Sequence, residues 1–204
     1  ENPLGYEPVG KLLMQFSVPA IISCLINSIY NIVDQIFIGQ GVGYQGNAAT
    51  TVAFPIMVIL LAFGNMTGAG SSAFAAIRLG EGNDKLAKKC LNNSFVFSFL
   101  LGVIIMVLGI IFLKPLLWLF GAKNSVIMNY SYDYTFIVLL GTPFNLVSIS
   151  LSNLARTDGN PKLAMYSMLI GAGLNTILDP IYIFILNWGV KGAAIATITS
   201  QIIS

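Results

Sequence analysis

Long apolar segments alternate with short polar ones along the whole chain. Each apolar segment is rich in Leu, Ile, Val, Phe and Ala, and most are long enough to cross the roughly 30 Å hydrocarbon core of a bilayer as a helix. This pattern predicts an all-α membrane protein, a six-helix transmembrane bundle whose sixth helix is truncated. The expected spans are 15–39, 52–79, 91–113, 130–155, 163–186 and 190–204.

The sixth span is short. Fifteen residues of helix from Val190 to Ser204 rise about 22 Å, less than the thickness of the hydrocarbon core. We therefore expect residues 1–204 to be the amino-terminal part of a longer protein. A natural protein with a mass of about 22 kDa, close to the 21.9 kDa of this chain, would contradict that expectation.

Composition narrows the functional class. Apolar residues make up 56% of the chain and charged residues 9%, against roughly a quarter charged in an average soluble domain. A net charge of +2 without a basic patch disfavours a nucleic-acid partner. There is no histidine, and the spacing of Cys24 and Cys90 does not suit a zinc or iron–sulfur site. We expect a membrane protein without a bound cofactor.

The positions of Lys and Arg predict the orientation. Cytoplasmic loops carry an excess of these residues. With the amino terminus in the cytoplasm, three cations lie outside, namely Lys114, Lys123 and Lys191, and seven lie inside: Lys11, Arg78, Lys85, Lys88, Lys89, Arg156 and Lys162. We expect a multi-pass protein of the inner (plasma) membrane with a cytoplasmic amino terminus.

Two carboxylates, Asp34 and Asp179, lie deep within predicted spans. Asp34 ends a polar stripe on the first span that also contains Ser23, Asn27 and Asn31. Asp179 lies in the fifth span, four residues after Asn175, so both side chains share one helix face. Burying an ionised Asp in hydrocarbon costs several kcal/mol unless it is paired, protonated or bound to a cation. These residues therefore predict an ion or proton pathway.

Helical rise places three polar residues at similar depth. Asp34, Asp179 and Thr197 lie about 9, 12 and 10 Å below the outer ends of their helices. If these helices are neighbours, two carboxylates, the Asn175 amide and a hydroxyl provide oxygen ligands suited to Na⁺ or to carrying a proton. The alternative is that both aspartates are hydrogen-bonded packing residues.

Two prolines are candidate hinges. Pro19 lies inside the first span, where it should kink or loosen the helix. Pro180 removes an amide donor directly after Asp179 and leaves the carbonyl of Thr176 free. We expect a glycine-rich loop at 40–51, a polar loop at 80–89 and an amphipathic stretch at 116–120.

The motifs also occur in a recognisable order. The chain contains Asp34 after a proline-containing span, a small-residue run from Gly64 to Ala76 that leads into Gly80-Glu-Gly-Asn-Asp84, then Arg156-Thr-Asp-Gly-Asn-Pro161 and Asn175-Thr-Ile-Leu-Asp179-Pro180. Over its whole length it resembles the amino-terminal lobe of multidrug and toxic compound extrusion (MATE) transporters, bacterial multidrug type. The resemblance implies twelve helices in two six-helix lobes, of which this chain is the first.

The resemblance further implies a function. Similar transporters are antiporters, not enzymes; they expel cationic amphiphilic drugs while taking in H⁺ or Na⁺, by alternating access between two lobes. The resemblance also implies that the first helix bends near Pro19. It assigns the cation or proton site, a candidate Na⁺ site, to Asp34, Asn175, Asp179 and Thr197, and it marks Tyr30, Asn27 and Asn31 as candidates for the same network or for substrate contact.

Three other functions are weaker candidates. A lipid-linked oligosaccharide flippase of the same superfamily would need basic residues inside its spans, whereas every Lys and Arg here lies at a span end or in a loop. An intramembrane aspartyl protease could use Asp34 and Asp179 as a dyad, but its Gly-x-Gly-Asp signature is only approached by Gly80-Glu-Gly-Asn-Asp84. A channel is disfavoured because no repeat could build a filter.

Overall fold

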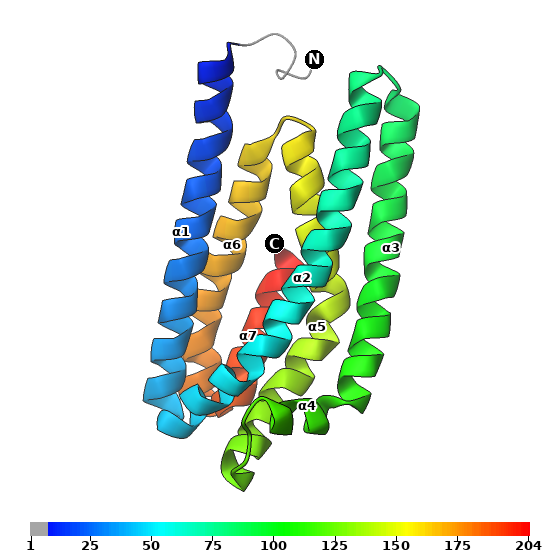
Figure 1. Ribbon diagram of the computed structural model, residues 1–204. Helices are drawn as coiled ribbons and strands as arrows, with labels where there is room; N and C mark the ends of the chain where they lie inside the picture. The colour runs from blue at the N-terminus through cyan, green and yellow to red at the C-terminus, as the bar shows by residue number, and fades with distance from the viewer. Residues whose placement is uncertain (1–7) are drawn as a thin grey trace.

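The computed structural model describes residues 8–204 and forms a bundle of long helices (Figure 1). No strand occurs in this range, so the predicted all-α fold is confirmed. Five segments are long and apolar enough to cross a membrane: α1 (Val9–Gly41), α2 (Tyr44–Gly80), α3 (Asp84–Ile111), α5 (Ser125–Thr157) and α6 (Pro161–Pro180), counted together with the η2 turn (Ile181–Ile185). The short helix α4 (Leu113–Leu119) and α7 (Gly189–Ile203) complete the bundle.

The prediction of a glycine-rich loop at 40–51 is wrong. Helix α1 continues to Gly41 and α2 begins at Tyr44, so only Val42 and Gly43 separate them. Gly43 adopts a φ of +81°, which allows the tight reversal without a Cβ clash. Gly46 is helical, and a Cβ there would lie 2.7 Å from the Val42 side chain. These glycines provide close packing at a short turn.

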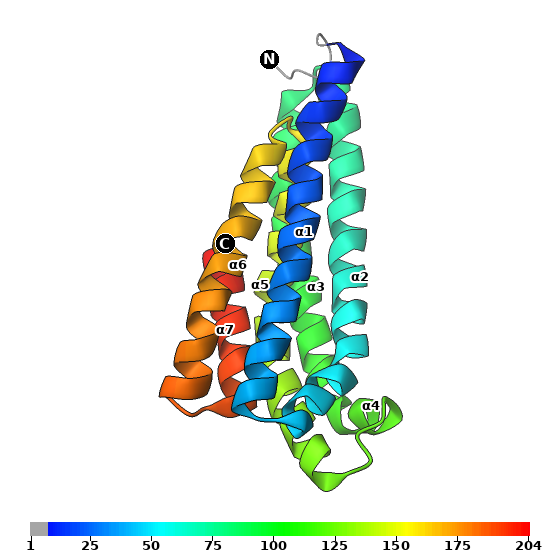
Figure 2. The same cartoon turned by 90° about the vertical axis from the view of Figure 1, so that its left-hand side faces the viewer.

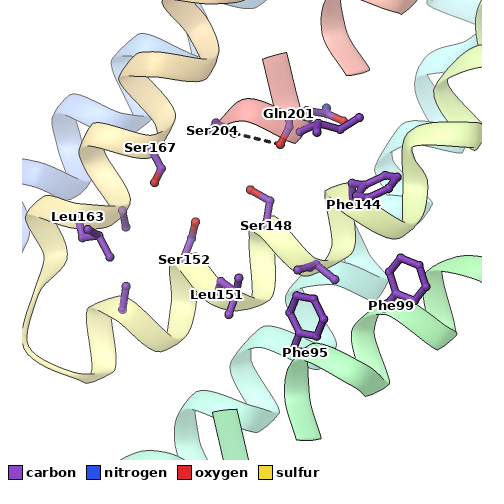
Figure 3. A pocket seen from close by; sticks show the side chains of 14 residues that line it. Phe95, Phe99, Phe144, Ser148, Leu151, Ser152, Leu163, Ser167, Gln201 and Ser204 are labelled. Atoms are coloured by element: carbon purple, nitrogen blue, oxygen red, sulfur yellow. Dashed lines mark hydrogen bonds between the residues drawn. The ribbon is translucent and has the colours of Figure 1, made fainter. Parts of the chain in front are cut away.

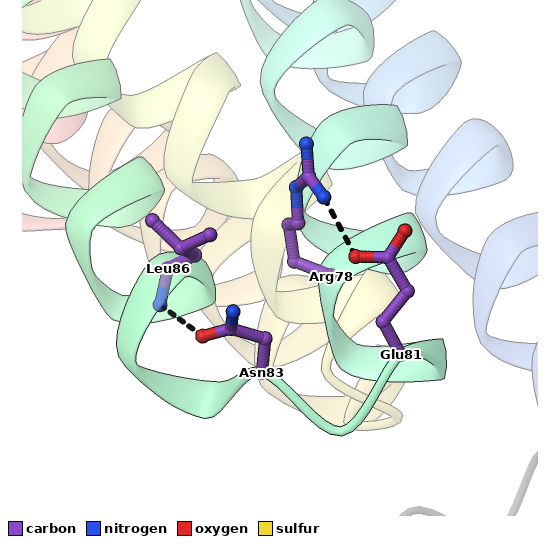
Figure 4. Close-up of polar contacts among 4 residues, drawn as sticks. All are labelled: Arg78, Glu81, Asn83 and Leu86. Carbon is purple, nitrogen blue, oxygen red and sulfur yellow. Dashed lines mark hydrogen bonds and ion pairs between the residues drawn. The ribbon is translucent and has the colours of Figure 1, made fainter.

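The α2–α3 connection is also shorter than predicted (Figure 4). The side chain of Asn83 caps α3 by accepting a hydrogen bond from the Leu86 amide at 3.2 Å. Arg78 pairs with Glu81 at 2.6 Å across the turn. Because α3 begins at Asp84, the lysines predicted to lie in a loop at 85–89 occupy its first turns.

The ends of two other elements also differ from expectation. The first helix begins at Val9, six residues before the start of the expected span 15–39, and residues 1–7 lie outside the described part of the chain. The amphipathic stretch predicted at 116–120 is α4, which begins three residues earlier and buries Leu113 and Leu117 completely. The residues at which the long helices enter and leave the membrane stay a prediction.

Helix α5 is the central element of the bundle. It packs against α2, α3, α6 and α7, and close contacts are made by small residues. A Cβ on Gly102 of α3 would lie 2.5 Å from the Pro143 backbone, and one on Gly64 of α2 would lie 2.7 Å from Ile149. Such small residues let helices approach closely in a membrane.

Helix α1 lies at one side of the bundle and packs mainly on α6. Figure 2 shows α1 in front, with α6 and α7 on its left and α2 on its right. In the most apolar 18-residue window of α1 only 11% of residues are buried, and in that of α3 only 17%. Their exposed Ile, Leu and Phe side chains suit hydrocarbon or a further protein surface. The contact between α1 and α6 brings together the helices that carry Asp34 and Asp179.

Candidate functional site

Four polar side chains from three helices meet in the interior of the bundle. Asp34 lies on α1, Asn175 and Asp179 lie on α6, and Thr197 lies on α7. Each is less than a tenth exposed, and Asp179 is fully buried. A shared site at similar depth requires these three helices to be neighbours. They are neighbours, because α6 packs against both α1 and α7. We call these four residues the polar cluster.

Asn175 is the centre of the hydrogen bonding in the polar cluster. Its Nδ2 group donates to Asp179 Oδ1 at 3.3 Å and to Thr197 Oγ1 at 3.4 Å. The Thr197 hydroxyl donates to the Ala193 carbonyl of its own helix at 3.0 Å. One amide thus joins α6 to α7.

The two carboxyl groups lie side by side. Asp34 and Asp179 approach within the range of a hydrogen bond between their side chains, so one proton can bridge them. Three oxygens in the polar cluster are buried without a hydrogen-bond partner: Asp34 Oδ1, Asp179 Oδ2 and Asn175 Oδ1. Buried polar atoms are rarely left unpaired, and unpaired oxygens from two carboxyl groups and an amide suit a proton or a hard cation.

The donor set disfavours a transition-metal site. Residues 8–204 contain no group of three or more His, Cys, Asp or Glu that could hold a metal ion. The polar cluster instead combines two carboxylates with neutral oxygen atoms, which fit Na⁺ better than zinc or copper.

Two tyrosines lie next to the polar cluster. Tyr30 of α1 and Tyr134 of α5 are both within electrostatic range of Asp34 and Asp179. Tyr30 was identified from the sequence, whereas Tyr134 was missed. A signal existed, because Ser131, Tyr134, Thr135 and Thr142 follow α5 at helical spacing and all are buried. This second polar stripe resembles the one on α1.

The structure separates Asn27 and Asn31 from the polar cluster. Both are exposed, and Asn31 Nδ2 donates at 2.6 Å to the Asn27 carbonyl of the same helix. Asn31 lines an open cavity of about 450 Å³ between α1 and α2, together with Ile32, Gln35, Ile36 and Asn47. In the described part of the chain no hydrogen bond joins either side chain to the polar cluster, and their roles in the network or in substrate contact stay predictions.

The two candidate hinges differ. Pro19 is buried within a continuous α1, and its carbonyl accepts a hydrogen bond from Ser23 at 2.8 Å. Pro180 is the last residue of α6, and the chain then changes to the wider π-helical turn η2. The helix type therefore changes at Ile181, two residues after Asp179.

A separate groove of about 340 Å³ lies between α3, α5 and α6 near the end of α7 (Figure 3). Phe95 and Phe99 line it from α3 and Phe144 from α5, and Ser148, Ser152 and Ser167 supply hydroxyl groups. It contains no charged residue and none of the polar cluster. The groove therefore lacks the carboxylates that the polar cluster provides.

Comparisons with known proteins identify the family of this chain. The MatE family model matches residues 19–181, a range that includes Asp34, Asn175 and Asp179. The multidrug export protein MepA of Staphylococcus haemolyticus (strain JCSC1435) is 36% identical over 202 residues, which cover 96% of this chain and 43% of that protein. The chain thus spans less than half the length of this relative.

Solved structures share the fold. The MATE multidrug transporter DinF-BH is 40% identical, with a TM-score of 0.90 over 97% of this chain and 44% of that one. An outward-facing multidrug resistance MATE family transporter of the MOP superfamily is 30% identical, with a TM-score of 0.89 over 95% of this chain and 42% of that one. Since the family model covers most of the described helices and the fold agrees throughout, the chain belongs to the MatE family.

Proposed function

We propose that the full-length protein is a cation-coupled drug exporter and that the polar cluster is its coupling site. The observation that carries this proposal is the buried Asp34–Asp179 pair, in which Asp34 Oδ1 and Asp179 Oδ2 lack hydrogen-bond partners. Relatives named as multidrug exporters support the transported class. The coupling ion is Na⁺ or H⁺, since either would offset one of the two negative charges of the ionised pair.

The proposed mechanism uses charge repulsion to bias alternating access. With an ion bound, Asp34 and Asp179 are held together and α1 packs on α6. Without it, two unit charges about 4 Å apart repel by about 4 kcal/mol at an effective dielectric constant of 20. Moving a two-state equilibrium from 1:99 to 99:1 takes about 5.5 kcal/mol. Repulsion of this size is therefore enough to supply most of the free energy that the conformational switch needs.

We propose cationic amphiphiles as the substrates. All ten Lys and Arg residues lie at helix ends, in the short α4 or in turns, so the helix interiors present carboxylates and neutral polar groups. This distribution favours a cationic substrate over the phosphate-bearing lipid of a flippase. The open cavity beside Asn31 offers amide and aliphatic contacts for it.

We propose that the protein spans the inner (plasma) membrane and that its amino terminus lies in the cytoplasm. The start of α1, the α2–α3 turn and the α5–α6 turn lie at one end of the bundle (Figure 1), and seven of the ten cationic residues belong to these segments. The excess of positive charge at this end supports a cytoplasmic location.

Gradient-driven efflux tests the proposal. The full-length protein is reconstituted in proteoliposomes loaded with a fluorescent cationic dye, and a Na⁺ or a proton gradient is imposed separately. We expect dye efflux to accelerate with an inward gradient of one ion and to stop when that gradient is collapsed. Equal dye movement with and without either gradient would mean passive transport and would overturn the coupling.

A further inference from the structure

The η2 turn lies directly beyond Asp179 and is held between two other helices. It packs against α1, α6 and α7. The Leu186 amide closes the wide turn by donating to the Ile181 carbonyl at 3.0 Å. The Trp188 amide donates to the Tyr182 carbonyl, also at 3.0 Å. Single π-helical turns occur frequently at functional sites. Here the turn links Asp179 to the end of the bundle where α7 begins.

On the α7 side, the contact is made by Gly192. A Cβ at this position would lie 2.9 Å from both the carbonyl carbon and the oxygen of Tyr182. These are backbone atoms, so no side-chain rotation can relieve the overlap. Reaching an ordinary contact of 3.4 Å would require α7 and η2 to separate by about 0.5 Å.

On the α1 side, the contact is made by Gly41. A Cβ there would overlap Ile183 Cγ2 and would lie 3.2 Å from Phe184 Cε1. Ile183 is only 3% exposed and belongs to the buried core, so it has little room to move. Phe184 also packs edge-on against Phe37 of α1, with ring centroids 6.2 Å apart.

These two contacts are in register with the polar cluster. Gly41 lies two turns after Asp34 on α1, and Gly192 lies five residues before Thr197 on α7. Tyr182 and Ile183 lie three and four residues after Asp179. Each contact is therefore one to two turns from the polar residue on its own helix, and η2 acts as a spacer between them.

We propose that Gly41 and Gly192 are positioning residues that set the separation of Asp179 from Asp34 and from Thr197, and thereby the affinity for the coupling ion. The proposal rests on the coupling function of the polar cluster. Functional sites tolerate displacements of only about 0.5 Å, which is the separation that one added methyl group would impose at Gly192. Gly41 acts on the α1 side of Asp179, and Gly192 acts on the α7 side.

The experiment compares Gly41→Ala and Gly192→Ala with a matched control, Gly173→Ala. Gly173 lies on α6 like Asp179, but no atom lies within 4 Å of an added Cβ. In the reconstituted full-length protein we expect each of the first two variants to raise the cation concentration for half-maximal dye efflux about tenfold. The dye concentration for half-maximal efflux should not change, and Gly173→Ala should behave like the natural protein.

A rescue variant separates positioning from general damage. Combining Gly41→Ala with Ile183→Ala removes the Cγ2 atom that the new methyl group would overlap, so the cation dependence should return toward the natural value. Failure of this rescue, an equal effect of Gly173→Ala, or parallel shifts in dye and cation dependence would overturn the proposal. If Gly192→Ala does not fold, the Gly41 pair decides the question alone.

The two proposals fail in different ways. If Asp34→Asn and Asp179→Asn keep cation-driven efflux, the coupling function of the polar cluster is wrong. If those variants lose efflux while Gly41→Ala and Gly192→Ala keep the natural cation dependence, only the positioning role is wrong.

Discussion

Replacing Asp179 with Asn in the full-length protein is expected to abolish cation-driven drug efflux while the helix bundle stays folded. Asn has the size of Asp and can still bond to Asn175, but it can neither take up a proton nor carry the charge that binds Na⁺. Asp34→Asn should have the same effect, because Asp34 and Asp179 act as a pair. We expect a loss of at least about a hundredfold in efflux rate, which corresponds to about 2.8 kcal/mol.

Asp133→Asn is the matched control for these variants. Asp133 precedes Tyr134 on α5, but its carboxylate is 37% exposed and pairs with Lys191 at 3.2 Å. Exposed ion pairs contribute about 0–1 kcal/mol, so efflux should stay near the natural rate. Drug resistance of cells that express each variant, normalised to membrane expression, measures the effect. Undiminished resistance with Asp34→Asn or Asp179→Asn would reject the coupling site.

The second large effect is expected at Asn175. Asn175→Leu removes the amide that donates to both Asp179 and Thr197, and it leaves the Asp179 carboxylate without that donor. Removing one partner of a buried polar group costs about 1–3 kcal/mol. We expect the cation concentration for half-maximal efflux to rise about tenfold or more, together with a lower unfolding temperature because the link between α6 and α7 is lost.

Asn93→Leu controls for the change of an amide to an aliphatic side chain. Asn93 is exposed on α3, away from the polar cluster, so this variant should keep the natural cation dependence. Efflux titrated against cation concentration, with thermal unfolding of the same preparations, checks both parts of the prediction. A natural cation dependence in Asn175→Leu would exclude Asn175 from the coupling site.

Much of the fold could be predicted from hydrophobic patterning. Apolar runs of membrane length locate the long helices, because a chain in lipid must satisfy its backbone hydrogen bonds within each segment. The helix ends were less predictable. Lys85, Lys88 and Lys89 indicated a loop, yet the Asn83 cap starts α3 before them. Glycines at 41, 43 and 46 also indicated a loop, although two of the three are helical and serve close packing.

The proximity of the candidate site residues could be predicted from sequence for those whose burial is costly. Carboxylates in apolar runs are conspicuous, and Asn175 and Thr197 followed from helix face and depth. Tyr134 was missed because a tyrosine can be buried in a membrane span at little cost and does not stand out from the sequence as a carboxylate does. The same limit applies to η2, because Pro180 predicts an interrupted helix but not the π-helical turn or its contacts with Gly41 and Gly192.

Ion release on drug binding is the most direct measurement of the central claim, that the Asp34–Asp179 pair couples the ion to drug transport. Purified full-length protein is equilibrated with Na⁺ at neutral pH in weak buffer, a cationic dye is added, and released Na⁺ and H⁺ are recorded. We expect release of one of these ions by the natural protein and none by the Asp34→Asn/Asp179→Asn double variant, provided that both bind the dye. Equal release by the two proteins would contradict it.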